Sequence, residues 1–231
     1  MKTIATIQGR KELQTRQVLR KVLLLCGILS SLLYVITDIL AAIQWESYSY
    51  TSQAVSELQA IGAPTRPFVI SLFSAYGMLV MAFGLGIWVT DGRKRARFGI
   101  ILFGYGIVGA VTLLFFPMHL RGAEGTISDI MHATLTGVIV LFILLFIGLG
   151  GTLHGKWFRL YSIGTILIIL LFGVLAGLDG PRITAQLPTP WLGIKERINI
   201  YATLLWVLVL SIKTLHVKNG QGLSGRPKAG Q

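Results

Sequence analysis

Residues 22–43 read VLLLCGILSSLLYVITDILAAI, an apolar stretch with a single charged residue, Asp38. Crossing the hydrocarbon of a bilayer takes about 20 apolar residues in a helix, so this stretch predicts a transmembrane helix. It is longer than the apolar region of roughly 7–15 residues that marks a cleaved signal peptide. Five further stretches meet the same requirement, although the last is short. The six predicted helices cover residues 22–43, 67–90, 98–118, 129–153, 160–178 and 199–215.

The composition supports a protein that uses lipid as its solvent. Of the 231 residues, 53% are hydrophobic and 13% charged, and the mean hydropathy is +0.71. A soluble domain carries about 25% charged residues. The chain is therefore predicted to be an all-α polytopic membrane protein with one six-helix domain over residues 21–216. A basic N-terminal segment, 1–20, precedes this domain, and a disordered tail, 217–231, follows it.

The basic residues predict the orientation in the membrane. Sixteen of the 21 Lys and Arg residues fall in residues 1–21, 91–97, 154–159 and 213–231. Cytoplasmic loops of membrane proteins carry an excess of Lys and Arg, so both termini are predicted to be cytoplasmic in the inner (plasma) membrane. The same distribution argues against nucleic acid as the partner behind the net charge of +12, since most of these cations flank apolar stretches.

Polar residues gather at the predicted outer ends of the helices. Asp38 lies inside the first helix, where a carboxylate is costly and needs a partner or a proton. The arginines on this side can pair with carboxylates or clamp a phosphate or carboxylate, because the guanidinium fork fits both. The candidate ligand-binding residues are Asp38, Ser56, Glu57, Arg121, Arg182, Glu196 and Arg197.

A second set of residues suggests a metal site. Asp129 and His132 are three residues apart, which places both on one face of a helix, and His119 lies a short loop away. Three protein ligands with one open position is the arrangement of catalytic zinc. Two structural roles are equally open to these residues: Ser128 and Asp129 can cap the fourth helix, and His132 can make a hydrogen bond between helices.

Several motifs resemble a known family. They are Ser56-Glu57-Leu58 with Gly62-Ala63-Pro64, Phe116-Pro117-Met118-His119, Asp129-Ile130-Met131-His132, Pro188-Thr189-Pro190-Trp191 and Glu196-Arg197-Ile198-Asn199. Over about residues 20–215 the chain resembles the bacterial and archaeal membrane proteins catalogued as domain of unknown function 998. This resemblance implies a six-helix bundle and no established activity. A looser similarity is to seven-helix zinc hydrolases of the alkaline ceramidase and progestin-receptor type, from which this chain departs in its six helices.

Three functions follow as hypotheses. The first is binding or moving a lipid or a small anionic molecule at the outer polar site. The second is a metal-dependent membrane hydrolase, in which His119, Asp129 and His132 hold zinc and a zinc-bound water attacks the substrate. The third is an accessory subunit of a membrane complex. Membrane lipids are the expected partners in each case, while the catalytic residues and the oligomeric state stay open.

Overall fold

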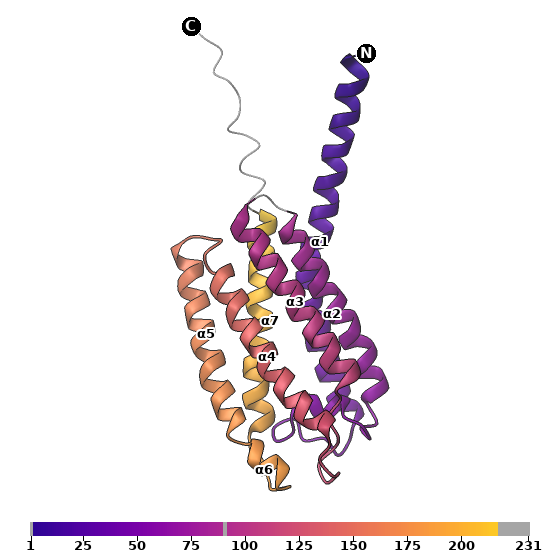
Figure 1. The fold of residues 1–231 in the computed structure, drawn as a ribbon, viewed down its shortest axis with the longest axis vertical. Helices are drawn as coiled ribbons and strands as arrows, with labels where there is room; N and C mark the ends of the chain where they lie inside the picture. Colours follow the sequence, from indigo (N-terminus) through magenta and orange to yellow (C-terminus); the bar gives the residue numbers. More distant parts are fainter. Residues whose placement is uncertain (1, 90–91, 217–231) are drawn as a thin grey trace.

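The computed structural model describes residues 2–89 and 92–216 and contains six long helices (Figure 1). All six are long and apolar enough to cross a membrane. Two short elements, the 3₁₀ helix η1 (Val55–Gln59) and α6 (Gly180–Thr184), lie between them. The long helices are α1 (Lys2–Gln44), α2 (Arg66–Trp88), α3 (Arg93–Phe115), α4 (Ile127–Gly150), α5 (Lys156–Gly177) and α7 (Leu192–His216).

The six helices run from one end of the bundle to the other (Figure 1). Helix α1 packs against both α2 and α7, α3 lies between α2 and α4, and α5 packs on α7. The loops 45–65, 116–126 and 178–191 meet at the end that carries α6, which we call the loop end. The opposite end, where α7 finishes at His216, is called the termini end.

Each end of the bundle has its own apolar core. At the termini end, Trp206 is completely buried and lies among the rings of Phe98, Phe146 and Phe158, with centroids 5.6–6.2 Å away. Its indole N–H donates to the Ser162 hydroxyl over 2.9 Å, which satisfies the polar edge of the ring. The core at the loop end contains residues of η1 together with α1, α2 and α3. Buried hydroxyls such as that of Ser162 are accommodated in these cores by hydrogen bonds within the protein.

Glycine permits the close crossing of α2 and α3. A Cβ atom added at Gly99 would lie 2.6 Å from the Gly84 carbonyl oxygen and 2.8 Å from the Trp88 Cβ. Lipid supplies no hydrophobic force between helices, so close backbone approach and van der Waals contact stabilise such crossings. Gly84 and Gly99 thus set the distance between the two helices.

The helices differ from the predicted ones mainly at their polar ends. Helix α1 begins at Lys2, so residues 2–20 of the predicted N-terminal segment belong to the first helix. Helix α7 begins at Leu192, seven residues before the predicted start, and so includes Glu196 and Arg197. A search for apolar stretches misses the first turns of α7, because the polar side chains of Glu196 and Arg197 bind partners inside the protein. The predicted tail 217–231 lies outside the described residues.

We expect Gly99→Ala to lower the free energy of unfolding by about 1–3 kcal/mol, the usual range for overpacking. The added methyl group would meet backbone atoms of α2 that cannot turn away. Thermal unfolding in detergent measures the effect. Gly109→Ala is the matched control on α3, because nothing lies within 4 Å of its added Cβ. Equal stability of the two variants would contradict the proposed role of Gly99.

Candidate functional site

A buried ion pair joins the first and last helices at the loop end. The Arg197 guanidinium donates from Nε to Asp38 Oδ2 over 2.9 Å and from Nη2 to Oδ1 over 2.8 Å. Asp38 is 0% exposed and Arg197 3% exposed. This two-pronged geometry is the strongest form of a carboxylate–guanidinium contact. Asp38 thus has the partner that its position in a membrane helix requires.

Three tyrosines complete this pair. The hydroxyls of Tyr50 and Tyr201 donate to Asp38 Oδ2 over 3.3 and 2.5 Å, and the Tyr48 hydroxyl accepts from Arg197 Nη2 over 2.9 Å. The guanidinium also lies 3.5 Å from the Tyr50 ring centroid. Burial raises the pKa of Tyr48 above its ordinary value, although the neighbouring Arg197 opposes that shift. The ring of polar groups fixes loop 45–65 against α1 and α7.

A second ion pair holds the loops to one another. Arg121 donates from Nε and Nη2 to the Glu57 carboxylate over 2.7–3.1 Å, and Glu57 is 1% exposed. The same guanidinium donates to the Thr189 hydroxyl over 2.7 Å and to the Ser52 carbonyl over 3.3 Å. Arg121 therefore ties together η1, loop 116–126 and loop 178–191.

The other candidate residues at the loop end have different surroundings. Ser56 lies half-buried in η1, outside both ion pairs. Arg182 is exposed on α6 and donates to the Pro188 carbonyl over 2.8 Å. Glu196 is half-buried on α7, where its Oε2 accepts the Val55 N–H over 2.6 Å. The predicted residues are thus brought to one end of the bundle, but two of the arginines, Arg121 and Arg197, already bind carboxylates.

His119 and Asp129 meet as the sequence predicts, in a contact that shapes the loop before α4. The Asp129 carboxylate lies 3.0 Å from His119 Nδ1 and accepts the backbone N–H groups of His119 and Thr126 over 2.7 and 2.8 Å. Thr126 precedes the first residue of α4, so it occupies the N-cap position expected for Ser128. Ser128 donates instead to the Pro117 carbonyl over 2.7 Å.

His132 lies apart from that pair. Its Nδ1 is 2.9 Å from the Phe116 carbonyl oxygen and therefore donates a hydrogen bond there, between α4 and the end of α3. Within residues 2–89 and 92–216, no group of three or more His, Cys, Asp or Glu side chains is arranged to hold a metal ion. The hydrogen bond proposed for His132 is present, and zinc binding stays a prediction.

The part of α4 nearer the loop end is less buried than the rest of the helix. His132 is buried, and the next buried residue on this helix is Phe146. Leu135, Thr136 and Ile139 follow His132 at helical spacing and lie on the same face. None of the three is buried. The inward face of α4 is thus only partly covered over its half nearer the loop end.

Helix α5 also becomes less buried toward the loop end. Its buried residues stop at Ile169, and Phe172, Gly173 and Ala176, which continue that face, are only half-buried. Helix α4 touches α5 and α7 at few points. In Figure 1, α7 is visible between α5 and α4 toward the α6 end. We call this region the α4–α5 seam and define it by Leu135, Thr136, Ile139, Phe172, Gly173 and Ala176.

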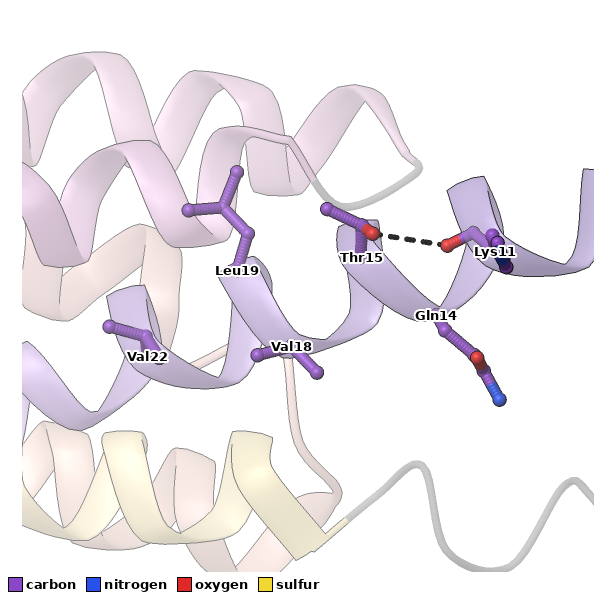
Figure 2. A pocket seen from close by; sticks show the side chains of 6 residues that line it. All are labelled: Lys11, Gln14, Thr15, Val18, Leu19 and Val22. Atoms are coloured by element: carbon purple, nitrogen blue, oxygen red, sulfur yellow. Dashed lines mark hydrogen bonds between the residues drawn. The ribbon is translucent and has the colours of Figure 1, made fainter. Parts of the chain in front are cut away.

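A hollow on the surface lies away from this site. Figure 2 shows its lining, which comes entirely from α1, with the Thr15 hydroxyl donating to the Lys11 carbonyl over 3.1 Å. The lining residues are Lys11, Gln14, Thr15, Val18, Leu19 and Val22. A binding site needs polar groups that converge from several elements, so this one-helix surface is a poor candidate.

Sequence reasoning missed the tyrosines that surround the ion pair. Tyr48 and Tyr50 follow the first predicted helix and suggest interfacial anchors, while Tyr201 lies in the sixth predicted helix without a distinguishing feature. Their separations from Asp38 in the sequence follow no helical or strand repeat, because loop 45–65 folds back over α1 and α7. The position of Asp38 within an apolar stretch was the one signal that hydroxyl donors must lie nearby.

The fold and the paired charges at its loop end define a multi-pass membrane protein. The chain belongs to the family described as "Protein of unknown function (DUF998)", whose model matches residues 28–213. Asp38, Glu57, Arg121, Glu196 and Arg197 all lie within the matched range. No curated protein and no solved structure matches the chain.

Breaking the buried ion pair should destabilise the protein strongly. We expect Asp38→Asn and Arg197→Gln each to lower the free energy of unfolding by about 3–5 kcal/mol, since each leaves a buried charge without its partner. The double variant should lose less than the sum of the two. A double-mutant cycle on thermal unfolding in detergent measures this coupling. Additive losses would contradict the assigned pairing.

The contact between His119 and Asp129 gives a separate prediction. We expect Asp129→Ala to cost about 1–2 kcal/mol, as the loss of a helix cap does, because Thr126 and His119 lose their acceptor. Repeating the melt with added Zn²⁺ tests metal binding. Stabilisation of the native protein that disappears in both Asp129→Ala and His132→Ala would favour the zinc prediction. Identical thermal unfolding curves with and without Zn²⁺ would contradict the zinc prediction and assign Asp129 only its structural role.

Proposed function

We propose that this protein binds a lipid or another small amphiphilic molecule at the loop end of the bundle, and that the molecule enters from the bilayer through the α4–α5 seam. Binding is the shared first step of sensing, storage and transport. The positive-inside distribution supports an orientation with the termini in the cytoplasm of a plasma membrane and the loop end outside.

The observation that carries the proposal is the inward face of α4 and α5, which is only partly covered near the loop end. Sites for small molecules lie between the helices of bundles, with mostly apolar walls and a few polar groups. The seam has this composition, since it contains the apolar side chains of Leu135, Ile139 and Phe172 and the hydroxyl of Thr136.

The seam also adjoins the polar part of α7. With its amide oriented to satisfy both neighbours, Asn199 donates to the Ile169 carbonyl over 3.0 Å and accepts the Gly173 N–H over 2.9 Å. Gly173 belongs to the seam, and Glu196 lies three residues before Asn199. An apolar tail in the seam would therefore point its head toward the loop end.

Two threonines of α4 allow a matched test. Thr136 lies on the inward face and Thr134 on the opposite one, yet both are exposed and both donate to the carbonyl four residues earlier over 2.8 Å. We expect Thr136→Phe to fill the seam and to reduce the lipid retained by the purified protein about tenfold, a loss of about 1.4 kcal/mol. Thr134→Phe should retain it.

Native mass spectrometry after exchange into a neutral maltoside detergent measures the retained molecule, and thermal unfolding checks that both variants fold. A native protein that retains no lipid and binds no added amphiphile would sink the proposal. Equal retention by the two phenylalanine variants would place the bound molecule somewhere other than the seam.

A further inference from the structure

Two ion pairs at the loop end leave one carboxylate of α7, that of Glu196, outside them. Three carboxylates, those of Asp38, Glu57 and Glu196, lie near two guanidinium groups, those of Arg121 and Arg197. Two pairs use both guanidiniums, and Lys195 is bound over 2.7 Å to Asp179, the residue before α6. Within residues 2–89 and 92–216, Glu196 takes part in no ion pair. Neither the Arg121 nor the Arg197 guanidinium therefore holds the Glu196 carboxylate in an ion pair.

Glu196 is also incompletely hydrogen-bonded. Its Oε2 accepts the Val55 N–H, while Oε1 has no hydrogen-bond partner within the described part of the chain. A carboxylate at this depth is expensive unless it binds a cation or a proton. The side chain is half-buried, so it remains accessible to a ligand.

Aromatic rings of α1, α2 and α3 pack together inside the bundle. The Tyr34 ring stacks on Phe73 at 4.4 Å and meets the edge of Tyr76 at 5.0 Å, and the Tyr76 and Tyr105 hydroxyls are 2.8 Å apart. Aromatic faces attract cations, and substituted ammonium groups are typical ligands of such rings.

Anion binding would require a different arrangement. Every N–H-bearing atom of Arg121 donates to a protein oxygen, and Arg197 donates to Asp38, Tyr48 and two backbone carbonyls. An anion would have to displace a carboxylate to reach either guanidinium. A cation meets an unpaired carboxylate without displacing any group.

We infer that the amphiphile bound at the loop end carries a cationic group, a primary or substituted ammonium, which pairs with Glu196. This inference rests on the proposed function and names the chemistry of its ligand. It differs from the anionic molecule expected from the sequence, because two of the three arginines that suggested an anion, Arg121 and Arg197, are neutralised within the protein.

Three amphiphiles with the same tail test the inference: octylammonium, octanol and octanoate. Isothermal titration of the full chain in maltoside gives each affinity, and uptake by the micelle is common to all protein variants. We expect the native protein to bind octylammonium about tenfold more tightly than octanol, equivalent to about 1.4 kcal/mol. Glu196→Gln should abolish this preference, although its amide oxygen can still accept the Val55 N–H.

Glu124→Gln is the matched control, since Glu124 is an exposed carboxylate in loop 116–126. It should keep the native preference, and thermal unfolding checks that both glutamine variants fold. Equal affinity for octylammonium and octanol, with both weakened by Thr136→Phe, would overturn the cationic inference and leave the proposed function standing. A preference for octanoate, or a preference for octylammonium that survives in Glu196→Gln, would also overturn it. Binding of none of the three would overturn both.

Discussion

The ion pair between Asp38 and Arg197 is the interaction on which the loop end depends. It joins residues 159 positions apart in the chain and links the first membrane helix to the last. Both side chains are almost completely buried, so the separation of either one would leave a bare charge in a medium of low polarity. The contact also positions the covering loop, because Arg197 donates to the Tyr50 carbonyl over 2.7 Å.

Residues at the start of α7 contact three other elements of the fold. Glu196 accepts from η1, Arg197 binds α1, and Asn199 reaches the backbone of α5. Lipid provides no hydrophobic drive for helices to associate, so polar contacts and close packing must specify which helices are neighbours. One turn of a helix thus specifies the arrangement of three other elements, while the aromatic core around Trp206 secures the opposite end.

Hydropathy was sufficient for the number and order of the membrane helices, because each needs a long apolar stretch whatever its neighbours are. It failed where polar residues continue a helix: α7 starts at Leu192 rather than 199, since the side chains of Glu196 and Arg197 bind partners within the protein. The sequence predicted that these polar residues lie at one end of the bundle, but not how they pair; whether they bind a ligand stays a prediction. In the sequence alone, three arginines on one side suggest an anion site. The structure shows that two of them are paired with Asp38 and Glu57. Likewise, the spacing of Asp129 and His132 shows a shared face, but not that His132 turns to a backbone carbonyl.

The burial of Trp206 has a spectroscopic consequence. The chain has five tryptophans. Trp88, Trp157 and Trp191 are 47–74% exposed and Trp45 is half-buried, whereas Trp206 is 0% exposed. Collisional quenchers dissolved in water or lipid reach the exposed indoles but not Trp206. The emission that survives such quenching therefore comes from one ring, held where α3, α4, α5 and α7 meet, and its lifetime reports the integrity of that junction separately from events at the loop end.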